Sequence, residues 1–242
     1  MSRFRKLILT LSPLSLIGWL LDSHYTKGLN QFNNGRFDVA ESLFASVNEN
    51  AHREQDTDKE KTEGAVVSRE YGDCQYALGL MRLYGIGATP QNVQEGISML
   101  ENAARPGNAR ATQNRALYLL GMYHLGTENA HPHTHKSCTK FLTQLKKEFA
   151  KKNIRTFTSS PAELYLLKAA GNGYIPAEYE LGMFYAKMSG TTPSSMWKEN
   201  ACMWLTKAKE SSQNIFNIRG AKLMKEQLAM IDATISHLQH KK

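Results

Sequence analysis

The stretch YELGMFY at residues 179–185 has two near copies upstream, YALGLM at residues 76–81 and YLLGMY at residues 118–123. Each copy places a glycine inside a segment that otherwise has the pattern of a helix. A glycine there costs about 1 kcal/mol relative to alanine, so three at equivalent positions need a compensating gain. We expect that gain to be the close approach of a second helix, whose bulky side chain packs against bare backbone. The three structural glycines are Gly79, Gly121 and Gly182.

A second amphipathic segment follows each copy. Its apolar residues recur at spacings of three and four, which makes a stripe that another helix must bury. Gly107 and Gly173 follow two of these segments, where a left-handed C-cap is usual. The pattern predicts an all-α fold, an α-solenoid of antiparallel helical hairpins. The interval from Tyr118 to Tyr179 exceeds that from Tyr76 to Tyr118 by 19 residues (61 against 42), which predicts an extra helix there.

The copies resemble Sel1-like repeats, whose pattern is A-x-x-x-L-G-x-x-Y-x-x-G-x-G followed by A-x-x-W-x-x-K-A-A-x-x-G. The resemblance covers about residues 71–212. The first copy has Arg82 where the second tyrosine of the pattern is expected, the second has its turn glycine displaced to Gly126, and the third lacks the paired turn glycines. The matching residues are Leu78, Gly79, Gly85, Gly87, Ala103, Ala104 and Gly107 in the first copy, Leu120 and Gly121 in the second, and Leu181, Gly182, Tyr185, Ala201, Trp204, Lys207 and Ala208 in the third.

Segments outside these copies complete the predicted organisation. Residues 24–47 resemble a tetratricopeptide hairpin, with Gly28, Gly35, Phe37, Ala40 and Phe44 at that motif's spacing. Residues 48–70 are charged and read as a solvated linker or an exposed helix extension. Residues 213–242 read as a C-terminal helix that caps the solenoid, with a heptad seam for a homodimer as the alternative. That helix carries its apolar residues at Met224, Leu228, Ile231, Ile235 and Leu238.

Residues 1–23 have the layout of an export signal. A cationic start, MSRFRK, precedes an apolar run at residues 7–21 that ends before Asp22. Fifteen helical residues would span only about 22 Å, less than the roughly 30 Å of a hydrocarbon core. A cleaved signal peptide and an uncleaved membrane anchor therefore remain equal alternatives, and a buried N-terminal helix is a third. The first two predict an exported protein, anchored in the inner membrane or periplasmic or secreted if the source is bacterial.

An insertion at about residues 130–160 separates the second copy from its partner segment. It contains an amphipathic pattern at Phe141, Leu142, Leu145 and Phe149, which predicts the extra helix. Imidazole and thiolate are suitable zinc ligands, but their spacing here matches no closed site, so we expect a polar loop, no metal and no cofactor. The weak metal candidates are His131, His133, His135 and Cys138.

The net charge of +8 raises the question of an anionic partner. The basic residues are scattered apart from one cluster, and no nucleic-acid motif accompanies them, so we expect a solvated helix face and no nucleic-acid partner. Catalytic signatures such as a P-loop or H-E-x-x-H are absent from the sequence, and we expect no enzyme activity. The cluster is Lys146, Lys147, Lys151, Lys152 and Arg155.

The resemblance implies a non-catalytic adaptor or scaffold that binds another protein, as a peptide or partner helix, in the solenoid groove. One alternative is a structural subunit of an envelope or secretion machine, and another is an anionic-ligand or metal-binding protein that uses the basic helix and the histidine loop. Packing between repeats is the competing role for the groove residues. The predicted partner-binding residues are Tyr76, Leu80, Tyr118, Met122, Tyr179 and Met183.

The export pattern generates a first prediction. We expect the full-length protein, expressed in its native host, to sediment with membranes or to reach the periplasm, because residues 1–21 carry a positive start and an apolar run. Cell fractionation followed by immunoblotting measures this. A protein found wholly in the soluble cytoplasm would contradict the export prediction and favour the buried helix.

Overall fold

The computed structural model describes residues 23–55, 64–127, 139–158, 160–191, 194–219 and 222–240. The named elements in these ranges are all α-helices, which confirms the predicted all-α fold. The chain divides into two compact units, Met1–Met99 and Leu100–Lys242. The boundary lies within helix α5 (Val93–Ala103). The packing of each unit is described separately below.

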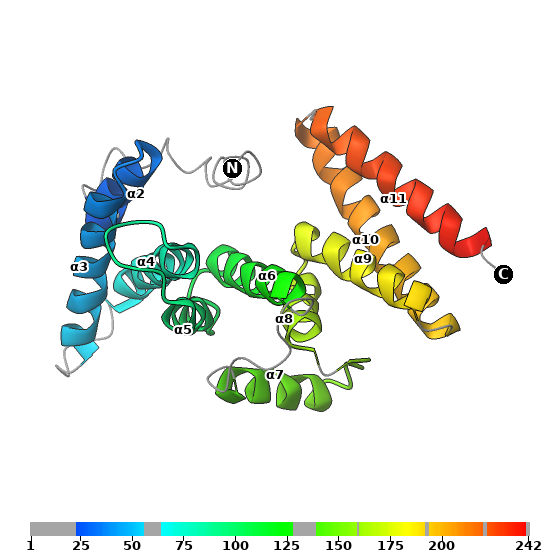
Figure 1. Cartoon of the computed structure of the whole chain (residues 1–242), viewed down its shortest axis with the longest axis horizontal. Coiled ribbons are helices and arrows are strands. Elements are labelled where there is room, and N and C mark those ends of the chain that lie inside the picture. Colours follow the sequence, from blue (N-terminus) through cyan, green and yellow to red (C-terminus); the bar gives the residue numbers. More distant parts are fainter. Residues whose placement is uncertain are drawn as a thin grey trace. The chain divides into compact units, whose positions relative to one another are not determined.

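The described part of unit 1 starts with a helical hairpin formed by α2 (His24–Asn33) and α3 (Phe37–Gln55), which pack against each other (Figure 1). Gly35 makes the turn between them in the left-handed conformation, at φ +76°. A Cβ on Gly28 would lie 2.6 Å from the ring of Phe44, so α2 needs a glycine where that ring crosses it. The segment that resembles a tetratricopeptide unit therefore forms a hairpin closed by a glycine–aromatic contact.

The charged stretch at residues 48–70 is helical at both of its described ends. Helix α3 continues to Gln55, and α4 (Gly64–Tyr84) begins before the stretch ends. Residues 48–55 and 64–70 are therefore helical, as in the alternative of a helix extension. Alanine, glutamate and arginine are good helix formers even where few apolar residues are available for packing, which is why a charged composition is compatible with helix here.

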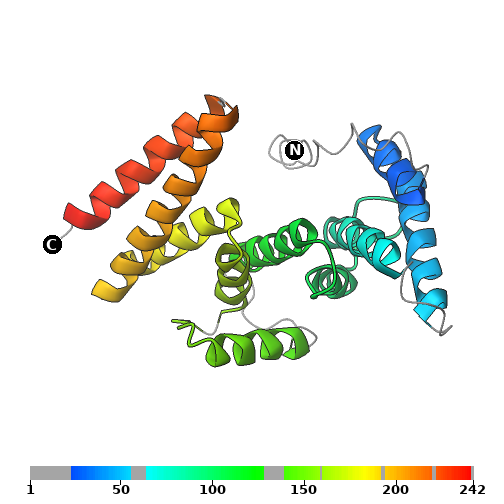
Figure 2. The ribbon, with the colours of Figure 1, turned by 180° about the vertical axis from the view of Figure 1, so that it is seen from behind.

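In the described residues of unit 2 after α5, helices pack as two hairpins with two further helices beside them. Helix α6 (Arg110–Thr127) packs against α8 (Pro161–Gly171), and α9 (Ile175–Thr191) packs against α10 (Ser195–Arg219). Helix α7 (Thr139–Lys151) lies against α8, and α11 (Lys222–His240) lies against α10 (Figure 2). Successive helices therefore pack as pairs, with α7 inserted between the two members of the first pair.

Gly121 and Gly182 lie at close contacts between paired helices. A Cβ on Gly121 would lie 2.7 Å from Cγ of Leu166 on α8, and a Cβ on Gly182 would lie 2.7 Å from Cγ of Leu205 on α10. Both contacts confirm that a bulky side chain of the partner helix packs on bare backbone. In unit 1 the residue of the second helix that faces Gly79 is itself a glycine. A Cβ on Gly96 of α5 would lie 2.9 Å from the carbonyl oxygen of Gly79 on α4.

Turn glycines adopt the conformation that their positions require. Gly107 and Gly173 have φ of +106° and +80°, which confirms the predicted left-handed caps. Gly85 and Gly87, after α4, also have positive φ. Gly126 differs, since it lies within α6 with no neighbour near its Cβ position, and therefore is not a turn glycine.

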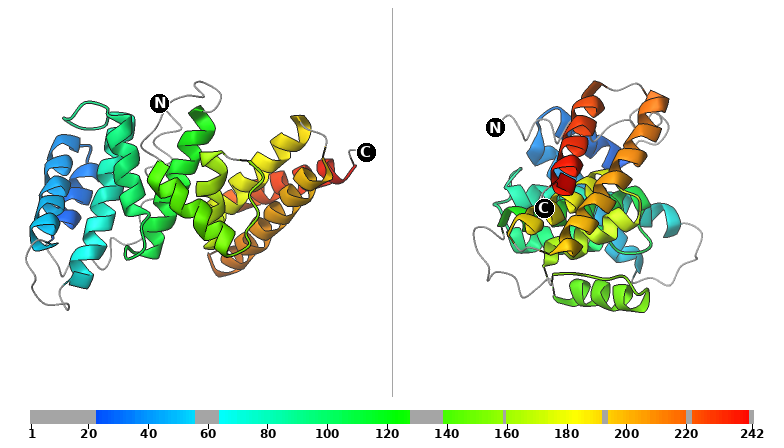
Figure 3. Two further views of the ribbon diagram at one scale, coloured as in Figure 1. Left: turned by 90° about the horizontal axis from the view of Figure 1, so that it is seen from below. Right: turned by 90° about the vertical axis from the view of Figure 1, so that its right-hand side faces the viewer.

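The inserted helix α7 accounts for the longer interval between the second and third copies. Its apolar side chains Phe141, Leu145 and Phe149 are buried, while Leu142 is half-buried. The Phe141 ring stacks near Tyr165 of α8, with centroids 6.1 Å apart. Figure 3 shows α7 as a separate helix alongside the rest of unit 2. The amphipathic helix of the insertion thus buries its apolar side chains, and it packs against α8.

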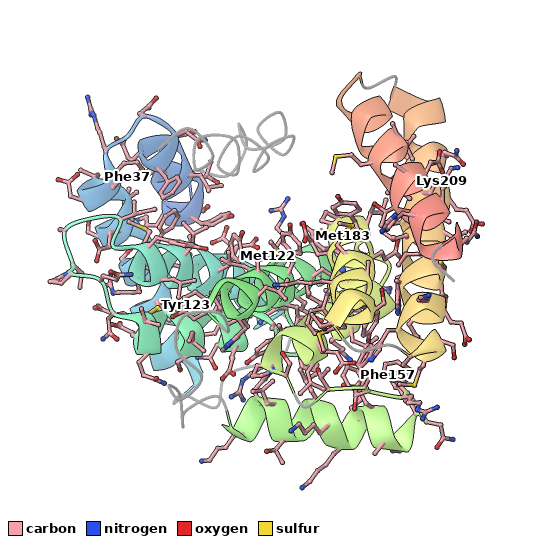
Figure 4. The ribbon with its side chains drawn as sticks, turned by 45° about the vertical axis from the view of Figure 1, so that its right-hand side comes forward. Phe37, Met122, Tyr123, Phe157, Met183 and Lys209 are labelled. Atoms are coloured by element: carbon pink, nitrogen blue, oxygen red, sulfur yellow. The ribbon has the colours of Figure 1, made fainter. Side chains whose placement is uncertain are left out.

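Helix α11 buries part of its apolar stripe against α10. Ile231 and Leu238 are 2% and 6% exposed, and Leu228 and Ile235 are half-buried. Lys209 of α10, labelled in Figure 4, makes an ion pair with Asp232 of α11 at 2.5 Å. The stripe that suggested a seam between two copies is thus in contact with a helix of its own chain.

The glycine contacts generate the second prediction. Gly121→Ala should lower the free energy of unfolding by about 1 to 2 kcal/mol, because the new methyl would overlap Leu166. Gly126→Ala is the matched control in the same helix, where nothing lies within 4 Å and the helix propensity of alanine should stabilise the fold slightly. Denaturant unfolding of both variants measures this, and equal effects at the two sites would contradict the close-approach account.

Candidate partner-binding face

The predicted partner residues occupy two positions relative to the helix glycine. Tyrosines lie three residues before it, and Leu80, Met122 and Met183 lie one residue after it. At 3.6 residues per turn, these positions are rotated from the glycine by about 60° and about 100° in the same direction. Because the glycine faces the partner helix of the hairpin, both positions lie on one flank of the first helix.

The structure gives unit 2 four half-buried side chains at these positions. Tyr118 and Met122 lie on α6, and Tyr179 and Met183 lie on α9. The Tyr118 ring meets the edge of Tyr174, which precedes α9, with centroids 5.5 Å apart. Figure 4 shows Met122 and Met183 on α6 and α9 near the middle of the view, with α7 along the bottom. These four residues, Tyr118, Met122, Tyr179 and Met183, are named the methionine face below.

The predicted partner residues of unit 1, Tyr76 and Leu80, differ in exposure. Tyr76 is half-buried, but Leu80 is only 6% exposed and belongs to the core. For Leu80 the competing role, packing, is therefore the one that the structure supports. A side chain so completely covered offers a partner almost no surface, and we leave it out of the candidate face.

Charged side chains border the methionine face. Arg115 is half-buried on α6, and Lys187 is exposed on α9. Burial raises the pKa of Tyr174, while the charge of Arg115 acts in the opposite direction with a smaller effect. Burial, followed by the nearby charge of Glu180, raises the pKa of Tyr179. The tyrosine hydroxyls thus stay neutral at physiological pH and can both donate and accept hydrogen bonds.

A buried carboxylate that the sequence analysis did not identify holds α9 beside the preceding hairpin. Ser160 caps the N-terminus of α8 and Pro161 occupies its first turn, which places Glu163 near the start of the helix with no solvent exposure. The backbone N–H groups of Phe157 and Thr158 each donate to Glu163 at 2.7 Å. Tyr185 of α9 donates its hydroxyl to Oε1 at 2.9 Å. Four donors, including the Thr158 hydroxyl at 2.6 Å, thus compensate one buried charge.

Glu41 in unit 1 has the same arrangement. The N–H groups of Ala88 and Thr89 donate to it at 2.8 and 3.2 Å, and the Thr89 hydroxyl and the Arg82 guanidinium donate as well. Gly87 leaves the room that this carboxylate needs, because a Cβ there would collide with it. Burial alone would raise the pKa of Glu41, but the hydrogen bonds from Thr89 and the interaction with Arg82 outweigh it, so the pKa lies below its ordinary value.

The two carboxylates are equivalent in position. Glu41 lies three residues before Phe44, which packs at Gly28, and Glu163 lies three residues before Leu166, which packs at Gly121. Their side-chain donors Arg82 and Tyr185 both lie three residues after a helix glycine. Arg82, the departure from the repeat pattern, is therefore a chemical replacement for the tyrosine. The usable sequence signal was an Ala-Glu pair in the first turns of a helix, three residues before the apolar residue that packs on glycine, at residues 40–41 and 162–163.

Further buried carboxylates in unit 2 contact other repeat residues. Tyr165 donates its hydroxyl to Glu101 at 2.6 Å. Glu178 has no solvent exposure and pairs with Lys207 of α10 at 3.1 Å, while the Lys207 ammonium also lies 4.7 Å from the centroid of the Trp204 ring. The lysine of the repeat pattern therefore contacts both the buried Glu178 carboxylate and the ring of the pattern's tryptophan.

The metal candidates and the export segment receive no test here. His131, His133, His135 and Cys138, like residues 1–22, lie outside the described residues. Among the residues that are described, no group of three or more His, Cys, Asp or Glu side chains could hold a metal ion. His124 is buried and stacks on Tyr165, with centroids 5.6 Å apart. None of the helices in the described ranges is long and apolar enough to cross a membrane.

The glutamate contacts generate the third prediction. Tyr185→Phe should lower the free energy of unfolding by about 2 kcal/mol, because it removes a buried hydrogen bond to a carboxylate. Tyr179→Phe on the same helix is the control, with an expected change within about 0.5 kcal/mol for a half-buried side chain. Chemical denaturation of the two variants measures the difference. If Tyr185→Phe unfolds like Tyr179→Phe, the Glu163 contact does not stabilise the array.

Comparison with known proteins gives one structural similarity. No protein-family model matches the chain, and no curated protein matches it. Among solved structures, the chain is similar to a Sel1 repeat protein from Oxalobacter formigenes, with 17% sequence identity and a TM-score of 0.25. The similarity covers 87% of this chain and 98% of that chain.

Proposed function

We propose that the protein is a non-catalytic scaffold that binds another protein through the methionine face of unit 2. The observation that carries this proposal is the repetition of one chemistry, a half-buried tyrosine and a half-buried methionine, on the first helices of two successive hairpins. Methionine adapts its shape to apolar partners, and tyrosine combines a large apolar ring with a hydrogen-bonding tip. The resemblance to Sel1-like and tetratricopeptide repeats, whose members act as adaptors, supports the same role.

The packing beneath the methionine face supports binding with little reorganisation. The backbones of α6 and α9 are held by the glycine–leucine contacts on one side. Glu163 ties α9 to the loop at residues 157–158. A preorganised surface loses less conformational entropy when a partner binds, so a modest apolar contact area is enough for useful affinity.

The charges around the face define the kind of partner. Arg115 and Lys187 lie on the same two helices as the methionines. A peptide or partner helix with apolar anchors for the methionine face and carboxylates for these cations would be complementary. The sequence of residues 1–21 supports an exported or membrane-anchored location for this interaction.

Site-specific photo-crosslinking provides the fourth prediction. We expect a photoreactive amino acid at Met122 or Met183 to crosslink the same protein in native-host cells. The same probe at Met203 is the control, because Met203 is 51% exposed on α10 and lies outside the face. The Tyr118→Ala/Met122→Ala variant should weaken the crosslink at Met183 at least tenfold, because it removes neighbouring anchors of the same partner.

Two results would contradict this function. A partner captured from Met203 but from neither Met122 nor Met183 would move the interface to α10 and favour the alternative of a machine subunit. A crosslink at Met183 that is unchanged in the double variant would show that α6 and α9 do not form one face. Circular dichroism of the double variant establishes that it is folded before either result is interpreted.

A further inference from the structure

Helix α7 carries a basic surface that the scaffold function does not use. The segment at residues 139–155 contains six cationic side chains and one carboxylate. The carboxylate, Glu148, is already engaged by Lys152 at 2.8 Å and by Lys168 of α8. Lys152 is thus paired with Glu148, and the segment contains no second carboxylate for its other five cations. The exposed cations of this segment, called the basic surface below, are Lys140, Lys146, Lys147, Lys151, Lys152 and Arg155.

The packing of α7 leaves this surface open. Phe141, Leu145 and Phe149 are buried on the side that meets α8. Helical geometry then places Lys140, Lys146, Lys147 and Lys151 on the opposite and lateral sides of the helix. These four side chains are exposed, so they are available to a partner.

An exposed aliphatic side chain lies at the end of the same helix. Asn153 adopts a left-handed conformation at φ +53°, and the N–H of Ile154 donates to the carbonyl oxygen of Phe149 at 2.8 Å. In such caps the residue at the position of Ile154 commonly packs back on the helix. Here Ile154 is 39% exposed, and both Lys152 and Arg155 beside it are exposed. The turn thus presents one apolar side chain surrounded by cations.

We propose that the basic surface of α7, together with Ile154, binds membranes that contain anionic phospholipids. Lysines on flexible stems match a diffuse layer of headgroup phosphates, and an aliphatic side chain among them can enter the boundary between headgroups and acyl chains. The expected membrane or envelope location from residues 7–21 is consistent with a second, weaker membrane contact. This inference is independent of the methionine face and extends beyond it.

The chemistry of the surface favours lipid over nucleic acid. Single-stranded nucleic acid is commonly held by exposed aromatic rings on which bases stack. Both aromatic side chains of α7, Phe141 and Phe149, are buried in its contact with the hairpin. The exposed side chain of Ile154, in contrast, would find no apolar group on a phosphate backbone, whereas a bilayer offers it acyl chains.

Vesicle flotation of the full-length chain is the test. The probes are vesicles of phosphatidylcholine alone and vesicles with about one-third phosphatidylglycerol, at low and high salt. The charge-reversal variant is Lys146→Glu/Lys147→Glu/Lys151→Glu. Its matched control, Lys27→Glu/Arg36→Glu/Arg105→Glu, changes the net charge by the same amount at exposed positions outside both α7 and the methionine face. Circular dichroism checks that both variants are folded.

We expect the unaltered chain and the control to favour anionic over neutral vesicles at least tenfold at low salt, and the α7 variant to lose most of that preference. Ile154→Ser should weaken binding to anionic vesicles several-fold while leaving its salt dependence unchanged. Equal binding to neutral and anionic vesicles, or an equal loss in the control, would overturn the proposal. So would a labelled RNA that binds through the same lysines while vesicles do not.

Discussion

The architecture depends on how closely two helices can approach at a residue without a Cβ atom. In each hairpin of unit 2, a leucine of the second helix rests on the backbone of a glycine in the first. The cost of glycine in a helix is offset by that contact, and the contact in turn determines which way each first helix is rotated. Once the glycine faces its partner, every other residue of the helix has a fixed direction. The tyrosine and methionine positions then fall on one flank, and the residue three places after the glycine is turned to the other side.

That other side is where the buried glutamates act. Glu41 and Glu163 would be costly in a low-dielectric interior if they stood alone, but each accepts two backbone N–H donors, a threonine hydroxyl and one long side chain from a later helix. The chemistry of the long side chain can change from tyrosine to arginine because the carboxylate accepts from either. The glycine contact thus holds the two helices of a hairpin together, and the glutamate connects one hairpin to the next helix. The residues of the methionine face lie on the flank of these helices away from the glutamate contacts.

Periodicity and spacing predicted much of this fold. The three helix glycines, the hairpin architecture and the inserted helix all follow from local patterns, because the spacing of apolar residues reports directly on helical geometry. Such patterns could not predict the glutamate contacts, because the donors to Glu163 come from a loop and from Tyr185, 22 residues away. A glutamate is also expected to be exposed to solvent when only the sequence is known. Leu80 shows the complementary limit. It occupies the same position as Met122 and Met183 in the repeat, yet it is buried, because exposure depends on neighbours that a repeat pattern does not specify.

The insertion of α7 also has a consequence for the order in which the chain folds. The first hairpin of unit 2 must bring α6 and α8 together across residues 128–160, whereas α9 and α10 are joined by residues 192–194 alone. Closing a longer loop costs more chain entropy, although the cost grows only logarithmically with length. Contacts between residues near in sequence form sooner than contacts between distant ones. We therefore expect the Gly182–Leu205 contact of the α9–α10 hairpin to form before α6 docks against α8.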